Sequence, residues 1–334
     1  MATNAGHDRG PEDRCPHVRR AARAAAIAAV AVVALAGCGT PDGPDADGPS
    51  VVATTTVLGD IAGRVAGCGG LEVETLMPVG ADPHDYSASS AEVQDLVKAD
   101  LVIVNGLGLE EGLASALDSA REDGANVFEV GPQLEPGEMG SHDEASDEHA
   151  DGDEEHDHSG LDPHVWLDVS RMADAAALIG SQLAEVTDDD AFVTCGEQVA
   201  AELMDTDAEV REILDAVPAD SRVLVTDHDA FGYFSEAYDF EVAGVVIPGG
   251  STLAELSSEE LAALADVIRE AGVHAIFANT AHRTDLIEAL SAEVGDVSVV
   301  ELYVGSLGVE GSGAEDYAGM MLTDARLIAQ ALSR

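Results

Sequence analysis

The triplet Asp-Pro-His occurs twice in this chain, as Asp82–His84 within PVGADPHDYSAS and as Asp162–His164 within LDPHVWLD. Proline removes a backbone donor and interrupts regular structure, so each histidine is expected on a loop. A third histidine, His228 in TDHDAFGYF, ends an expected strand. Three neutral imidazoles that converge from loops suit Zn²⁺, with Zn–N distances of about 2.0–2.1 Å. The three positions therefore predict a metal site.

Carboxylates stand beside each of these histidines in the sequence. A metal-binding imidazole usually has its second nitrogen held by a carboxylate or a carbonyl. The candidates for this role are Asp82, Asp162, Asp227 and Asp229, and the sequence does not select among them. Other roles are expected for two further histidines. His274, inside VHAIFAN, is expected to pack in the core, and His282 is expected to cap a helix.

A second feature that could bind metal is the segment 141–160, SHDEASDEHADGDEEHDHSG, which has no large apolar residue and cannot form a core. It contains His142, His149, His156 and His158, four of the 11 histidines in the chain. Such a segment is predicted to be a disordered loop. An acidic, solvated insert with incidental histidines is the alternative, but this concentration of histidine favours an auxiliary metal-binding loop.

The elements that must position these residues alternate between short apolar runs and helical patterns. Four β units are expected between residues 51 and 130, and a second set begins with RVLVTD at 222–227. DLVIVNG, at 100–106, has almost no polar face, as expected for a strand covered on both sides. This alternation predicts an α/β fold with two parallel-sheet lobes. Loops at the carboxyl ends of such sheets line a crevice, so the metal site is expected in the cleft between the lobes.

One long helical pattern separates the two sets. Residues 188–218 repeat apolar side chains every three or four positions and predict a rigid connector helix. The resulting division has six parts, listed from the N-terminus: signal peptide 1–37, flexible tether 38–50, N-terminal lobe 51–187, the loop 141–160 within it, connector 188–218 and C-terminal lobe 219–334.

The N-terminus has the pattern of an exported protein. Arginines at 19, 20 and 23 precede the apolar stretch AAAIAAVAVVALAG, which is typical of a secretory signal. LAGC, ending at Cys38, resembles a bacterial lipobox, in which the cysteine becomes the lipidated first residue. A plain secretory signal is the alternative. The expected location is the outer face of the bacterial cell membrane, with a lipid anchor on Cys38.

Cys68 and Cys195 remain once Cys15 and Cys38 are assigned to the leader and the lipid site. In an oxidising compartment such a pair is expected to form a disulfide. Two free buried thiols or metal ligands are the alternatives.

The composition excludes some partners. The chain has 334 residues, 65 acidic against 15 basic, and a formal net charge of −50. Because a chain with this negative charge repels phosphate backbones, nucleic-acid binding is not expected. A general acidity of the source proteome would explain the charge equally well, so the charge alone does not indicate a cationic ligand.

The order of these motifs resembles the zinc/manganese substrate-binding proteins of bacterial ABC importers, the zinc-uptake A-type or cluster A-I family. The resemblance covers nearly the whole mature chain and rests on TTTVLGDIA, PVGADPHDY, ADLVIVNGLGLE, DPHVWLD, HDAFGYF and YAGMM. It implies two lobes joined by one long helix, with the metal between them. It also implies that His84, His164 and His228 are the histidine ligands. An ABC permease and its ATPase are the implied partners of a chain expected to be a monomer.

One position departs from the family. Many members have an aspartate ligand in a D-[SA]-[LM]-G stretch, which here reads GSLG with Gly305 at the Asp position. Water, Glu301 or Asp316 could supply the fourth ligand instead. Imidazole suits Zn²⁺ and carboxylate suits Mn²⁺, so the change favours Zn(II) over Mn(II).

The expected function is therefore a non-enzymatic receptor that captures Zn(II) outside the membrane for an ABC importer. A Mn(II) receptor of the same family is the first alternative. A zinc hydrolase is another, since three histidines with an open position also describe a catalytic zinc, although no HExxH signature occurs. A surface zinc buffer or cell-adhesion protein is the third.

Overall fold

The computed structural model describes residues 48–139, 160–247, 258–281, 285–295 and 297–333. The chain divides into two compact units, Met1–Asp45 and Ala46–Arg334, and all described residues belong to the second. The signal peptide, Cys38, the auxiliary loop histidines and His282 lie outside the described residues. Among the described helices, none has the length and apolar character needed to cross a membrane.

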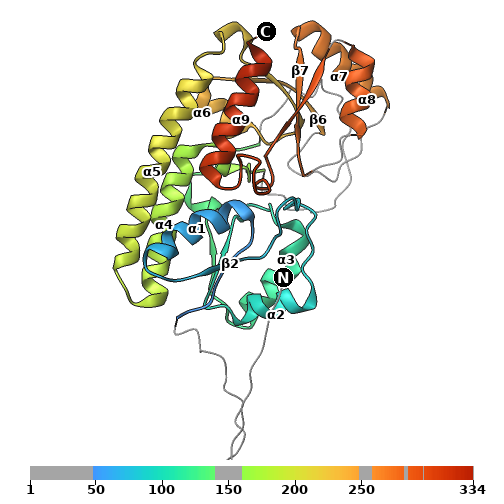
Figure 1. The fold of residues 1–334 in the computed structure, drawn as a ribbon. Helices are drawn as coiled ribbons and strands as arrows, with labels where there is room; N and C mark the ends of the chain where they lie inside the picture. The colour runs from blue at the N-terminus through green and yellow to red at the C-terminus, as the bar shows by residue number, and fades with distance from the viewer. Residues whose placement is uncertain (1–47, 140–159, 248–257, 282–284, 296, 334) are drawn as a thin grey trace, which may run out of the picture. The chain divides into compact units, whose positions relative to one another are not determined.

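Two four-stranded parallel sheets form the framework of the second unit (Figure 1). The first has the order β2-β1-β3-β4 and the second the order β6-β5-β7-β8, so the two lobes repeat one topology. The strands are β1 Val51–Ala53, β2 Val73–Thr75, β3 Leu101–Val104, β4 Val127–Glu129, β5 Val223–His228, β6 Glu241–Ile247, β7 Ala275–Asn279 and β8 Ser298–Leu302. The two parallel-sheet lobes expected from the alternating pattern are confirmed.

Nine helices connect and cover the described strands. They are α1 Thr56–Cys68, α2 Ser90–Lys98, α3 Ala114–Glu122, α4 Val169–Thr187, α5 Ala191–Leu214, α6 Gly232–Tyr238, α7 Ser258–Ala271, α8 Asp285–Val294 and α9 Tyr317–Leu332. Four 3₁₀ turns lie between them: Glu111–Leu113, Gly131–Gln133, Val165–Leu167 and Ala219–Ser221. Strand β1 ends at Ala53, because Thr55 then caps α1 by accepting from the Leu58 N–H at 3.2 Å.

Strands β1, β3 and β7 are buried along their whole length, and therefore on both faces of their sheets, which explains their apolar sequences. In β1, Val51 and Ala53 belong to a core shared by both lobes, whereas Val52 belongs to an outer core of the first lobe. In β5, Leu224 faces the shared core and Val225 an outer core of the second lobe. Successive strand residues point to opposite faces, so each sheet contributes to one common and one separate core.

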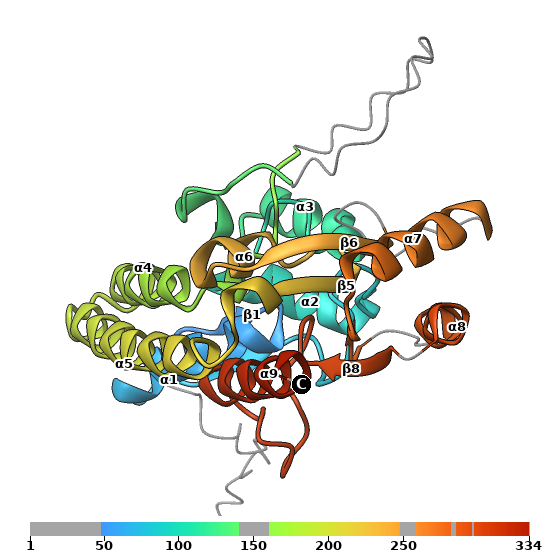
Figure 2. The same cartoon turned by 90° about the horizontal axis from the view of Figure 1, so that it is seen from above.

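The predicted connector corresponds to α5, which has 24 residues and links the two lobes (Figures 1 and 2). At about 1.5 Å per residue it is about 36 Å long. It packs closely against α4, because Gly180 and Gly196 lie at their contact. A Cβ at Gly180 would lie 2.6 Å from the Phe192 carbonyl oxygen, and one at Gly196 2.7 Å from the Ala176 carbonyl oxygen.

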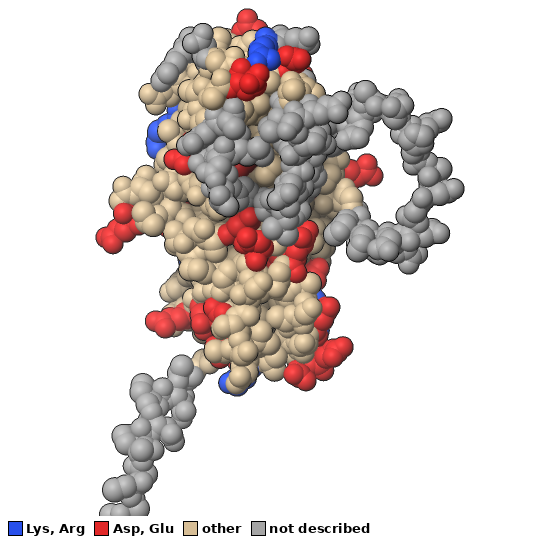
Figure 3. All heavy atoms as spheres, turned by 90° about the vertical axis from the view of Figure 1, so that its right-hand side faces the viewer, with Lys and Arg blue, Asp and Glu red and all other residues tan. Residues whose placement is uncertain are grey.

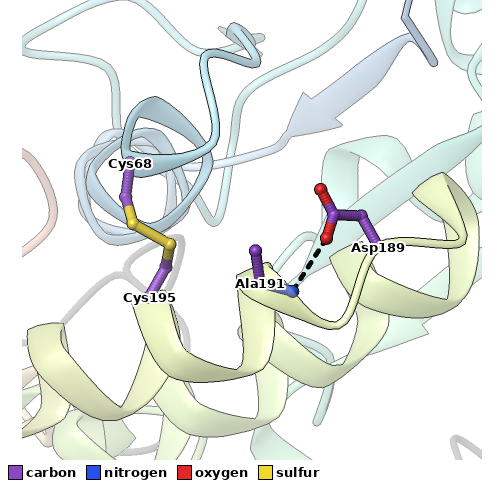
Figure 4. The surroundings of a disulfide bond; sticks show 4 residues. All are labelled: Cys68, Asp189, Ala191 and Cys195. Carbon is purple, nitrogen blue, oxygen red and sulfur yellow. Dashed lines mark hydrogen bonds between the residues drawn. A yellow bond between two sulfur atoms is a disulfide. The ribbon is translucent and has the colours of Figure 1, made fainter.

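A disulfide joins Cys68 at the end of α1 to Cys195 in α5, with Cα atoms 5.9 Å apart (Figure 4). The predicted pairing is thus present in the structure. The start of α5 is also fixed by Asp189, whose carboxylate accepts from the Ala191 N–H at 2.9 Å. The disulfide attaches the first half of the connector to the first lobe.

Asp324 on α9 is a buried carboxyl, 4% exposed, that accepts a hydrogen bond from the Tyr303 N–H at 3.1 Å. Burial raises the pKa of this carboxyl well above its usual range. Because the folded pKa lies above the unfolded one, stability is fully present below the unfolded pKa, about 3.9, and is lost as pH rises through the folded pKa.

We therefore expect Asp324→Asn, which keeps an acceptor for Tyr303, to gain stability relative to wild type as pH rises above about 4. Urea unfolding at a series of pH values measures this difference. The matched control is Asp205→Asn, since Asp205 is exposed on α5, and it should follow the wild-type profile. Parallel pH profiles of D324N and wild type would contradict the buried, protonated carboxyl.

Candidate metal centre

The three predicted histidines lie together and are almost completely buried. His84 is 2%, His164 0% and His228 1% exposed. One ring nitrogen from each forms a group in which all these atoms lie within 4.8 Å of one another. The ring centroids are 5.2–6.0 Å apart. Two loops of the first lobe and the end of β5 in the second therefore converge on one point.

The distance between two of the ring nitrogens fits a shared metal ion. Nε2 of His84 lies 3.3 Å from Nε2 of His164. Two nitrogens bound to one tetrahedral Zn²⁺ at about 2.0–2.1 Å are separated by about 3.3–3.4 Å. Only small adjustments of these two side chains are needed for a shared ion.

The repeated Asp-Pro-His triplet has one local function at both positions. The Asp82 carboxylate accepts from the His84 backbone N–H at 3.0 Å, and the Asp162 carboxylate accepts from the His164 N–H at 2.9 Å. An aspartate that bonds the backbone two residues later forms a tight local turn. This turn fixes the backbone position of each histidine, and both Asp-Pro-His triplets form it.

Two carboxylates hold the second ring nitrogen of their histidines. Asp162 Oδ1 lies 2.8 Å from Nδ1 of His164, and Asp227 Oδ1 lies 2.8 Å from Nδ1 of His228. Nδ1 donates to the carboxylate in this arrangement, which leaves Nε2 as the acceptor for a metal. Asp227 also accepts from the Asn279 N–H at 2.8 Å through its other oxygen, so it joins the ends of β5 and β7.

A buried glutamate, Glu110, is linked by hydrogen bonds to the loop that carries His164. Glu110, 5% exposed, accepts from the Thr54 hydroxyl at 2.8 Å, the Asn105 N–H at 2.7 Å and the Gly106 N–H at 3.0 Å. Burial raises the pKa of Glu110, and these hydrogen bonds oppose the rise. The side-chain amide of Asn105 in turn donates to the Pro163 carbonyl at 2.9 Å. Glu110 thus links the ends of β1 and β3 to the loop that carries His164.

No carboxylate from the described part of the chain joins the three-histidine group. Glu301 is exposed on β8, and Asp316 caps α9 by accepting from the Gly319 N–H at 2.7 Å. Gly305 lies beside the site, since a Cβ built there would be 3.1 Å from Pro83 Cδ and 3.1 Å from Asn279 Nδ2. Neither Glu301 nor Asp316 therefore belongs to the histidine group in the described residues.

The structure corrects one expectation and adds contacts that the sequence did not indicate. His274 is exposed and precedes β7, so its assignment to the core was wrong. Trp166 donates to the Val304 carbonyl at 2.8 Å, across the two lobes. Its ring lies 5.3 Å from the His164 ring. No pattern in the sequence pointed to Val304 as its partner.

The surface drawn in Figure 3 is acidic, with more red than blue side chains. The three imidazoles are buried beneath the surface. A negative surface attracts cations in general, whereas the histidine group supplies nitrogen ligands that bind a borderline metal.

Fold and site together define a two-lobed binding protein with a three-histidine group that can hold a metal ion. Residues 51–331 match the family described as the periplasmic zinc-uptake complex component A, and the chain belongs to this family. The resemblance inferred from the motifs is therefore confirmed.

Two relatives are similar over most of their length. The chain is 33% identical over 297 residues to the zinc-binding protein TroA of Treponema pallidum, covering 86% of this chain and 91% of that protein. It is 30% identical over 297 residues to the manganese-binding lipoprotein MntA of Halalkalibacterium halodurans, with coverage of 86% and 90%. The solved structure of the periplasmic zinc-binding protein TroA from T. pallidum matches with a TM-score of 0.73 at 31% identity. The match covers 86% of this chain and 100% of the TroA chain. These relatives are binding proteins, not enzymes.

Replacing Asp162 by asparagine removes the carboxylate that orients His164. We expect Asp162→Asn to weaken Zn²⁺ binding by about 10–100-fold, the usual effect of losing such a partner. Competition with a chromophoric chelator measures the change. The control is Asp174→Asn, since Asp174 is exposed on α4. Equal affinity of D162N and wild type would contradict the assigned role.

Proposed function

We propose that the chain is a receptor that captures Zn(II) outside the cytoplasmic membrane and delivers it to an ABC permease with its ATPase. The observation that carries this proposal is the buried group of three imidazoles, with two Nε2 atoms 3.3 Å apart. His84, His164 and His228 are the proposed ligands, and a water molecule completes the tetrahedron. Cys38 is the proposed lipid-anchored residue, and the receptor acts as a monomer.

The nitrogen-rich ligand set favours zinc over manganese. Mn²⁺ prefers carboxylate and water oxygen, whereas imidazole suits Zn²⁺. Gly305 supplies no side-chain oxygen beside the site, and the carboxylates of Asp162 and Asp227 hold His164 and His228 through Nδ1. Manganese remains the second candidate, because the H. halodurans relative is named as manganese-binding.

Metal preference is testable at position 305. We expect wild type to bind Zn²⁺ more tightly than Mn²⁺ in equilibrium dialysis, and Gly305→Asp to reduce that preference by about tenfold or more by adding an oxygen ligand. Gly305→Ala is the matched control, since it adds the same contact with Pro83 without a carboxylate. A wild type that prefers Mn²⁺ would contradict the zinc assignment.

The same dialysis tests the proposed auxiliary loop. A form lacking residues 141–160, with His142, His149, His156 and His158, should keep the tight site and lose weaker ones. Retention of all sites would exclude a metal role for the loop.

Delivery to an importer is testable in cells. We expect deletion of the gene in its source strain to slow growth under a zinc-selective chelator, and added zinc, but not manganese, to restore it. The wild-type gene and D174N should complement the deletion, and His228→Ala should not. Normal growth of the deletion strain in zinc-depleted medium, with no other zinc receptor present, would favour the buffer or adhesion alternative.

A further inference from the structure

Residues Val304–Leu307, which follow β8 of the second lobe, form hydrogen bonds with the first lobe at three separate places. The Val304 carbonyl accepts from the Trp166 indole at 2.8 Å. The Ser306 hydroxyl accepts from the Gly80 N–H at 2.8 Å. The Leu307 N–H donates to the Thr56 hydroxyl at 2.9 Å. We call residues 304–307 the interlobe segment.

Two of these contacts involve the loops that carry the first-lobe histidines. Gly80 lies in PVGADPH, four positions before His84, and Trp166 lies two positions after His164. Within the interlobe segment, Gly305 lies against Pro83, the residue before His84. The second lobe therefore contacts both Asp-Pro-His loops through one short stretch of chain.

Ser306 makes the most connections within the interlobe segment. It is 2% exposed, and a hydroxyl can donate one hydrogen bond and accept two. Besides the bond from Gly80, its Oγ lies 3.3 Å from the Thr56 hydroxyl and donates to the Leu307 carbonyl at 3.2 Å. Gly80, by contrast, is exposed and has a positive φ of 85°.

The exposure of Gly80 and the burial of Ser306 predict the effect of removing the Ser306 hydroxyl. Gly80 is exposed, so its N–H can bond to water when Ser306 is truncated and is not left unsatisfied. The 78–84 loop, however, loses the hydrogen bond from Gly80 to Ser306 of the second lobe. A metal ligand needs a supporting structure that holds it to a fraction of an ångström, so the main consequence falls on the position of His84.

We propose that Ser306 is a positioning residue of the metal site, which acts from the second lobe on the first-lobe loop that carries His84. The inference rests on the proposed metal-receptor function. It implies that the three imidazoles take their binding arrangement only while the interlobe segment is docked on the first lobe. Separation of the lobes at this segment would then release His84 and weaken the hold on the ion.

The test compares Ser306→Ala with Ser291→Ala in the full chain. Ser291 donates to the Val297 carbonyl at 2.7 Å within the second lobe, so its truncation removes a similar bond without touching the first lobe. The zinc-loaded proteins are mixed with excess chelator, and fluorescence of Trp166, the single tryptophan, is followed with time. We expect S306A to release zinc about tenfold faster than wild type, in the range of losses for supporting residues, and S291A to match wild type.

A double-mutant cycle with His84→Ala separates positioning from general destabilisation. If Ser306 acts through His84, S306A should have no further effect on zinc affinity in the H84A background. An additive effect, or equal release rates for S306A, S291A and wild type, would overturn the inference. A wild type that binds no zinc would instead overturn the proposed function, so the two failures are distinguishable.

Discussion

The structure depends on one constraint: three imidazoles from two lobes must meet at one point, with one ring nitrogen of each close enough to the others to share an ion. His84 and His164 reach this point from loops of the first lobe, and His228 from the end of β5 in the second. The three imidazoles are almost completely buried, and carboxylates at Nδ1 fix the orientation of two of them. Lobe packing, loop turns and interlobe hydrogen bonds all serve to maintain this convergence.

The lobes can satisfy that constraint because they share a core. Inner faces of both sheets, together with α1, α4, α5 and α9, contribute to a single continuous cluster of buried residues. The Cys68–Cys195 disulfide fixes one half of α5 to the first lobe. Asp207, in the other half, accepts from the Tyr238 hydroxyl of the second lobe at 3.0 Å. A relative displacement of the lobes therefore has to occur against contacts along α5 as well as at the interlobe segment.

Much of the framework and the histidine group could be predicted from the sequence, because both leave local signals. These are the apolar periodicity of the strands and helices, and the Asp-Pro-His triplets that place histidines on loops. The supporting contacts could not. Ser306 and Gly80 are 226 positions apart, and nothing in GSLG indicates which loop it will meet. The error at His274 has a similar cause: it stands beside an apolar strand, but β7 begins one residue later, so periodicity alone did not assign its face. The sequence likewise did not select Asp162 and Asp227, since that choice depends on the folded loops.

The most direct test of this account is a crystal structure of the zinc-loaded protein with anomalous diffraction at the zinc edge. The account predicts one strong anomalous peak between the lobes, about 2.0–2.1 Å from one ring nitrogen each of His84, His164 and His228. Its central claim would be contradicted by a peak bound elsewhere, or by ring nitrogens too far apart to share a single ion.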